Sequence, residues 1–408
     1  MDRSESPASC ACLIATGLSW FAFVGMPTAV QGQDVPTLRP APATATATRA
    51  FTSISGIREL SDGRVVLADR SERILVLLGA DLDSSATMGR PGQGPREYGI
   101  PFRIHPLPGD SSIVTDAATR GWFILDGPEI VDTWRGRRVP TERMEMDFEG
   151  IAGGERIVGL RTHRYTSPDA WPGLPLGPTH ADSVAVLMAG SWSDEGDGTP
   201  DTLAVIAGGG NRTFCMSVAT DSRRSDPIGG CSPISGQDLV LPFPDGWIAF
   251  LYHSPYHVEW RNPDGAWVQG EPLPLEPRPL SSSPEEQCLA LLRYPFREVE
   301  GPCSRGDLAG LDWPADVPPF LGRSAGRMAA PATPGAFAAP DGRLVVRRTP
   351  GLRFMENRYD LLNREGALEA VLVLPANEAI VGFGRNSVYL VETDEFDLQT
   401  LRRHPWPW

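Results

Sequence analysis

The chain has 408 residues, of which 41% are hydrophobic, so it can bury a sizeable core. Its 51 acidic residues outnumber 37 basic ones, and the resulting formal net charge of −14 disfavours nucleic acid and anionic lipid as partners. Every basic residue is arginine, and the absence of lysine excludes Schiff-base catalysis and a Walker-type phosphate loop.

The first 32 residues have the features of a secretory signal peptide. An uncharged apolar stretch runs from Cys10 to Met26, Pro27 follows it, and Val30-Gln31-Gly32 provides the small residues of a cleavage site. We therefore expect an exported protein, periplasmic or secreted, without a membrane span after cleavage. An uncleaved N-terminal anchor is the alternative. No later stretch of the chain approaches the roughly 20 apolar residues that a membrane span needs.

Residues 33–48 are rich in proline, alanine and threonine. Such a composition buries little apolar surface, and it predicts a disordered linker. A single domain, residues 49–408, is expected to follow.

From residue 49 onward one unit recurs six times: an apolar strand, a tight turn, a second apolar strand, a polar loop and a third strand. Glycine, aspartate and asparagine at the turns supply the positive φ that hairpins need. The turns are Asp62-Gly63, Gly109-Asp110, Gly153-Gly154, Asp245-Gly246, Asp341-Gly342 and Arg385-Asn386. They are 44 to 47 residues apart, except for two intervals of 92 and 96. A repeat of about 40 to 50 residues is typical of a four-stranded propeller blade.

The two long intervals permit either eight blades or six blades with insertions. The first interval has no further copy of comparable quality. The second contains a helix signal, in which Ser283 is an N-cap, Pro284 takes the first helical position and Glu286 completes a capping box. We therefore predict an all-β, six-bladed β-propeller with a short helical insertion between blades 4 and 5.

Four cysteines remain after the signal peptide, and they form two local pairs. Cys215 and Cys231 are 16 residues apart, and Cys288 and Cys303 are 15 apart. Four cysteines permit three connectivities, of which local pairing is the simplest in an oxidising compartment. A zinc site is the alternative, although neither pair has CxxC spacing and no histidine is close in sequence.

Two segments resemble bacterial six-bladed β-propellers of the NHL-repeat type. Gly92–Tyr98 with Pro101-Phe102 is similar to the loop between blades, and Val65–Asp69 with Arg73-Ile74 is similar to the second and third strands. The resemblance is good near residues 54–134 and 336–402. It implies that a strand near residues 49–54 pairs with the C-terminal strands and closes the ring. It implies little about activity, because this fold hosts many functions.

In propellers the loops from second to third strand lie at one end, where ligands usually bind. Here these loops gather arginine, histidine and tyrosine, which suits an anionic or sugar-like small molecule, or a protein ligand. The plainer interpretation is that surface loops are polar and arginine is the only abundant cation. The candidate ligand-binding residues are Asp69, Arg70, Asp116, Arg161, His163, Tyr165, Tyr252, His253, His257, Arg347 and Arg348.

No catalytic motif is evident, so we expect a non-catalytic binding protein without a cofactor. The first alternative is a lactonase- or esterase-like hydrolase, because six-bladed lactonases hold Ca²⁺ or another divalent cation on the axis through Glu, Asn and Asp. The acidic residues that could reach the axis are Glu59, Asp147, Glu149 and Asp238. The second alternative is a structural scaffold in an extracytoplasmic assembly.

Overall fold

The computed structural model describes residues 35–134, 147–163, 184–191, 201–207, 238–293, 303, 308, 313, 315–320, 335–351 and 356–407, apart from 93, 95, 120, 154, 155, 276 and 277. The predicted signal peptide, residues 1–32, lies outside them. Val35–Trp408 forms one compact unit. None of the helices in the described part of the chain has the length and apolarity that a membrane crossing requires.

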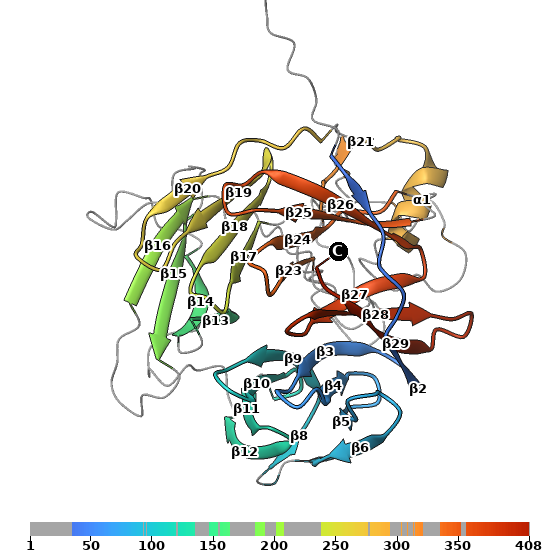
Figure 1. The fold of residues 1–408 in the computed structure, drawn as a ribbon. Coiled ribbons are helices and arrows are strands. Elements are labelled where there is room, and N and C mark those ends of the chain that lie inside the picture. Colours follow the sequence, from blue (N-terminus) through green and yellow to red (C-terminus); the bar gives the residue numbers. More distant parts are fainter. Residues whose placement is uncertain are drawn as a thin grey trace, which may run out of the picture. The chain divides into compact units, whose positions relative to one another are not determined.

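Five four-stranded antiparallel sheets have the architecture of propeller blades (Figure 1). Their strands are β3 (Ile54–Glu59), β4 (Val65–Asp69), β5 (Ile74–Leu78) and β6 (Ser85–Met88); β9 (Pro101–Pro106), β10 (Ser111–Asp116), β11 (Gly121–Asp126) and β12 (Glu129–Trp134); β13 (Asp147–Ala152), β14 (Arg156–His163), β15 (Val184–Ser191) and β16 (Asp201–Ala207); β17 (Leu239–Pro242), β18 (Ile248–His253), β19 (Tyr256–Arg261) and β20 (Trp267–Gln269); and β2 (Ala45–Phe51), β27 (Glu378–Phe383), β28 (Ser387–Thr393) and β29 (Gln399–Pro405).

A further sheet has five strands. Four of them form an antiparallel meander, and the fifth pairs in parallel with its outer edge. The strands are β23 (Ala336–Ala338), β24 (Leu344–Arg347), β25 (Glu356–Leu362), β26 (Leu368–Pro375) and β1 (Thr37–Leu38). Two short pairs are β7 (Arg90–Pro91) with β8 (Glu97–Tyr98), and β21 (Arg278–Pro279) with β22 (Asp316–Val317). The predicted β-propeller is confirmed, and the count of six blades stays a prediction.

The repeated unit folds as the turn pattern predicts. Gly63, Gly246 and Gly342 have φ of 84°, 88° and 87°, a region that glycine enters without steric cost. The second strand β4 is apolar from Val65 to Ala68 because it is buried on both faces. Val65 and Leu67 pack into one hydrophobic cluster, whereas Val66 and Ala68 pack into the cluster on the opposite side.

The first strands of successive sheets lie next to one another. β3 contacts β9, β9 contacts β13, β13 contacts β17, β17 contacts β23, and β27 contacts β3. These strands run in the same direction. Near their starts the Ser55 hydroxyl donates to the Phe102 carbonyl at 2.7 Å, and beyond their ends the Ser61 hydroxyl donates to the Asp110 carboxylate at 2.7 Å.

The two ends of the propeller therefore differ. We call the end where the first strands begin the loop end, because the loops from second to third strand lie there; Ile54 at the start of β3 pairs with Asp69 at the end of β4. We call the opposite end, which carries the Asp-Gly turns, the turn end.

The N-terminal strand β2 pairs with β29 and so completes the sheet of the C-terminal strands, as the family resemblance implies. The prediction of a disordered linker over residues 33–48 is corrected from Thr37 onward, because β1 and the first half of β2 lie within it. The alternation of alanine and threonine has the period of a strand: Ala47 is buried, and Thr46 and Thr48 are exposed.

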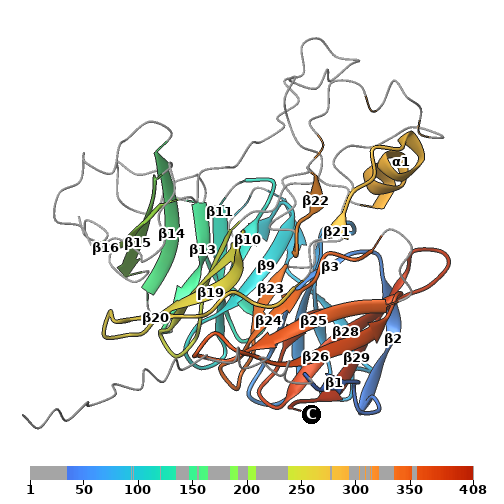
Figure 2. The same cartoon turned by 90° about the horizontal axis from the view of Figure 1, so that it is seen from above.

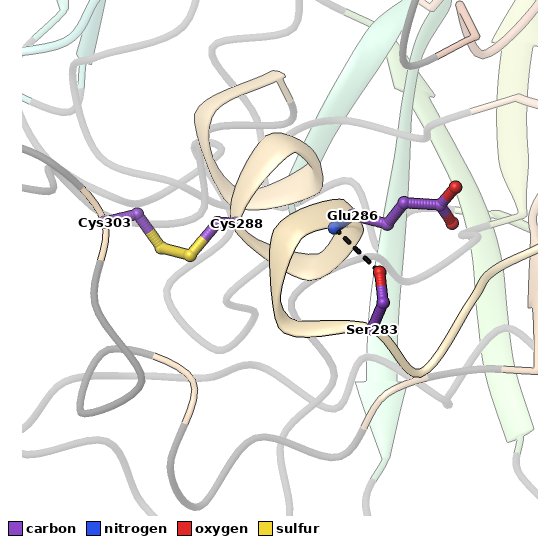
Figure 3. The surroundings of a disulfide bond; sticks show 4 residues. All are labelled: Ser283, Glu286, Cys288 and Cys303. Atoms are coloured by element: carbon purple, nitrogen blue, oxygen red, sulfur yellow. Dashed lines mark hydrogen bonds between the residues drawn. A yellow bond between two sulfur atoms is a disulfide. The ribbon is translucent and has the colours of Figure 1, made fainter.

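Helix α1 (Pro284–Arg293) begins where the N-cap signal predicts and follows β20 and β21 in the chain. The Glu286 backbone N–H donates to the Ser283 hydroxyl at 3.2 Å (Figure 3). The helix carries Cys288, which forms a disulfide with Cys303, the pairing that local spacing predicts. A zinc site at this pair is therefore excluded. Cys215 and Cys231 lie outside the described residues.

The segment that contains α1 attaches at the loop end. The Arg278 guanidinium donates to the carbonyl of Thr349, in the loop after β24, and the Thr349 N–H donates to the Pro319 carbonyl at 2.8 Å. Figure 2 shows α1 and β22 beyond the ends of β23 and β24. This segment therefore covers part of the loop end.

Candidate functional site

Two of the predicted ligand contacts are used by the protein itself. The Asp69 and Asp116 carboxylates are buried at the ends of β4 and β10. Asp69 accepts hydrogen bonds from the backbone of Thr52 at 2.7 Å and of Ser71 at 3.0 Å, and Asp116 accepts one from Gly99 at 2.7 Å. In each sheet the carboxylate ties the loop before the first strand to the loop after the second. We therefore leave both residues out of the site.

The hairpin of β18 and β19 concentrates polar side chains at the loop end. Its two-residue turn places Tyr252 directly opposite His257, and their rings stack with centroids 4.7 Å apart. Glu259, two residues further along β19, shares that face. It accepts a hydrogen bond from the Tyr252 hydroxyl at 3.2 Å and lies 3.7 Å from His257 Nε2. All three side chains are buried.

Electrostatics keeps Tyr252 protonated and favours a charged His257. Burial, and then the charge of Glu259, raise the pKa of the Tyr252 phenol, so it acts as a hydrogen-bond donor. Burial alone would lower the pKa of His257. The hydrogen bonds to Glu259 and to the Pro255 carbonyl, together with the charges of Glu259 and Asp238, outweigh burial and raise the pKa of His257.

His253 is the histidine that reaches solvent beside this cluster. Its Nδ1 lies 2.7 Å from the Asp238 carboxylate, which also accepts its backbone N–H at 3.0 Å. The His253 side chain is 30% exposed and that of Asp238 is 18% exposed. The carboxylate fixes the ring orientation, and among the described residues Nε2 has no hydrogen-bond partner.

Two arginines at the loop end of the sheet of β23–β26, Arg347 and Arg348, bind other residues of that sheet, and one of these contacts extends to the neighbouring sheet. The Arg348 guanidinium pairs with the buried Asp360 at 2.6 Å, and Asp360 also accepts the Tyr256 hydroxyl from β19 at 2.9 Å. Arg347 donates to Asn357 at 3.0 Å. Both arginines thus have partners within the protein, and their anion-binding role stays a prediction.

The remaining predicted residues divide between described and undescribed parts of the chain. Arg70 lies over the ring of Phe102, with its central carbon 5.4 Å from the ring centroid. Tyr165 lies outside the described residues. Two more predicted residues, Arg161 and His163, lie on β14. Asp147 and Glu149 lie on β13. The side chains of all four lie outside the described part of the structure.

Two of the four acidic residues suggested for an axial cation, Glu59 and Asp238, lie at opposite ends of the propeller. Glu59 ends β3 at the turn end, where it accepts hydrogen bonds from Ser387 at 2.5 Å and Tyr389 at 2.6 Å. Asp238 precedes β17 at the loop end, and it is bound to His253. Within the described ranges no three His, Cys, Asp or Glu residues are grouped to hold a metal ion. These two carboxylates therefore do not fit one cation.

The raised pKa of His257 predicts a pH-dependent stability. The histidine contributes its full stabilisation below its unfolded pKa of about 6.5, and it loses that stabilisation as pH rises through the higher folded value. We expect the free energy of unfolding to fall across this window, by at most about 1.4 kcal/mol per pH unit for one proton. Urea titrations between about pH 5.5 and 8.5 measure it. In His257→Gln this component should vanish, and an unchanged slope would contradict the assignment.

Sequence reasoning missed Glu259 and Asp360, because each lies within a strand rather than a loop. A signal was present for Glu259. Tyr256–Arg261 reads as an apolar strand that carries a histidine and a glutamate two residues apart, and residues with that spacing share one face.

No family model matches this chain, and a search of curated proteins found no match. Solved structures with a similar fold include a DUF4221-family member from Bacteroides vulgatus (10% identity, 89% of this chain and 97% of that chain, TM-score 0.45) and a putative exported protein from Bacteroides fragilis (9%, 90% and 98%, 0.44). A calcium-binding regucalcin from Agrobacterium tumefaciens is also similar (9%, 91% and 97%, 0.38). Likeness at this level assigns no function.

Proposed function

We propose that this chain is an exported β-propeller that binds a small-molecule or protein ligand at its loop end, with His253 as a contact. The observation that carries the proposal is the Asp238–His253 pair. A half-exposed imidazole is oriented by a carboxylate at 2.7 Å beside a buried polar cluster. Because its orientation is fixed, this imidazole loses little conformational entropy when it forms a hydrogen bond with a ligand.

The surrounding side chains support a fixed binding surface. Tyr252 and His257 belong to the same hairpin as His253, and their rings stack on each other. Glu259 accepts a hydrogen bond from the Tyr252 hydroxyl. Because these groups have partners within the protein, the hairpin loses little conformational freedom when a ligand binds.

The finer features of the fold belong to the proposal. We count the five-stranded sheet of β23–β26 and β1 as a blade, which makes six, and we take the segment with α1 as an insertion between blades 4 and 5. The disulfide Cys288–Cys303 supports an oxidising, extracytoplasmic location.

A thermal-shift panel tests the binding proposal. The probes are glucose, N-acetylglucosamine, glucuronate, citrate and the Ca²⁺ ion, each added to the purified mature protein. A probe at about ten times its Kd should raise Tm by about 2 °C. We expect His253→Ala to lose most of the shift. The matched control is Glu365→Ala, an exposed residue of the turn between β25 and β26 at the turn end, which should keep it. Equal shifts in all three proteins would contradict a role for His253.

A further inference from the structure

The segment that carries α1 has a small core of its own. Ala290 of α1 and Val317 of β22 are buried together, and Leu280 and Trp313 are partly buried around them. A helix of ten residues is too short to be stable by itself in water. We call the described residues between 278 and 320 the cover segment. Its fold therefore depends on its attachments to the propeller and on its disulfide.

The cover segment is attached to the hairpin that carries the candidate ligand contact. Phe320 is fully buried, and its ring packs against that of Tyr256 with centroids 5.6 Å apart. Tyr256 pairs with His253 across the turn between β18 and β19. One residue before Phe320, the Pro319 carbonyl accepts the Thr349 N–H at 2.8 Å. The cover segment therefore borders the site of His253 at the loop end.

The disulfide between Cys288 and Cys303 fastens α1 to the chain that follows it (Figure 3). Both cysteines are partly exposed, so a reductant in solution can reach the sulfur atoms. The bond joins residues 15 positions apart, and closing a loop of about that length changes an opening equilibrium on the order of a hundredfold. The sheets of β17–β20 and β23–β26 share a separate buried cluster, which does not contain the disulfide.

We infer that the cover segment is a redox-controlled wall of the loop end, which the disulfide holds in place and a dithiol reductant releases. One thiolate of the dithiol attacks a sulfur of the disulfide, and its second thiolate then displaces the mixed disulfide. The dithiol becomes a disulfide, and its two electrons and two protons leave Cys288 and Cys303 as thiols. The inference rests on the proposed function in one respect, the ligand site that the cover segment borders.

Hydrogen exchange with residue-level mass spectrometry tests the inference on the purified mature protein, with and without dithiothreitol. Three sets of amides are compared: those of α1, the Thr349 N–H that the cover segment protects, and those of β18 and β19. We expect reduction to accelerate exchange in α1 on the order of a hundredfold and to accelerate Thr349 as well. The amides of β18 and β19 should keep their rates. The measurement involves no ligand, so its outcome is independent of binding at His253.

Two double variants assign the effect to this disulfide. Cys288→Ser with Cys303→Ser should exchange fast in α1 and at Thr349 without reductant, and dithiothreitol should change nothing further. Cys215→Ser with Cys231→Ser keeps the disulfide and should respond as the wild type does.

Three results would overturn the inference. The first is a Cys288–Cys303 bond that stays intact in dithiothreitol, as alkylation of free thiols would show. The second is acceleration in α1 with Thr349 unchanged, which would mean that the helix frays while the cover segment stays attached. The third is equal acceleration in β18 and β19, which would mean that the disulfide stabilises the whole domain.

Discussion

Replacing Arg364 by alanine is expected to lower the free energy of unfolding by about 2 to 3 kcal/mol. Arg364 lies in the turn between β25 and β26, and its guanidinium lies over three rings of the neighbouring sheet, Phe243, Trp247 and Trp260, at 4.3, 4.9 and 4.4 Å. Each cation–π contact contributes about 0.5 to 1 kcal/mol, and the buried alkyl chain adds packing. Asp245 pairs with Arg364 at 2.8 Å but is 54% exposed, so it adds little.

Urea unfolding followed by tryptophan fluorescence measures the effect, because two of the three rings are tryptophans. Arg343→Ala is the matched control. Arg343 also pairs with an aspartate, at 2.6 Å, but within the described part of the chain it lies over a single ring, that of Trp406 at 4.8 Å. We expect it to cost about 1 kcal/mol or less. Losses of equal size in the two variants would show that the number of rings does not determine the stabilisation.

Replacing Gly366 by alanine is expected to cost about 3 kcal/mol or more. This glycine, in the same turn as Arg364, has φ of 81°, which L side chains rarely adopt. A Cβ here would lie 2.5 Å from the Cα of Gly270 and 3.2 Å from the carbonyl of Val258, both in the neighbouring sheet. Backbone cannot move aside as a flexible side chain can, so steric overlap adds to the strain.

Gly127→Ala separates strain from overlap. Gly127, in the turn between β11 and β12, also has a positive φ, 52°, but a Cβ there would meet nothing within 4 Å. It should cost only the strain, about 1 to 2 kcal/mol. Chemical denaturation of the two variants gives the difference, which measures how closely the two sheets approach. A Gly366→Ala variant no less stable than Gly127→Ala would contradict this close approach.

The sequence predicts the individual sheet better than the contacts between sheets. Turn chemistry and strand pattern are local, so the turns at Gly63, Gly246 and Gly342 and the second strands that follow them are where the pattern places them. The contact of Arg364 with Asp245 joins residues 119 positions apart. No local pattern indicates such a pair, because it depends on how one sheet packs against the next.

The candidate site was only partly predictable for the same reason. The repeat pattern places His253 at the loop end, where it ends β18. The pattern does not distinguish a partly exposed histidine from a carboxylate that accepts backbone hydrogen bonds. Asp69 and Asp116 end the equivalent strands β4 and β10, and both are enclosed by N–H donors from neighbouring turns.

The most direct test of ligand binding at the loop end is the dissociation constant of the best probe for wild type, His253→Ala and Glu365→Ala. If His253 contacts the ligand, its loss should weaken binding about tenfold, the equivalent of one hydrogen bond, and Glu365→Ala should match the wild type. A dissociation constant for His253→Ala within about twofold of the wild type would contradict the proposed site.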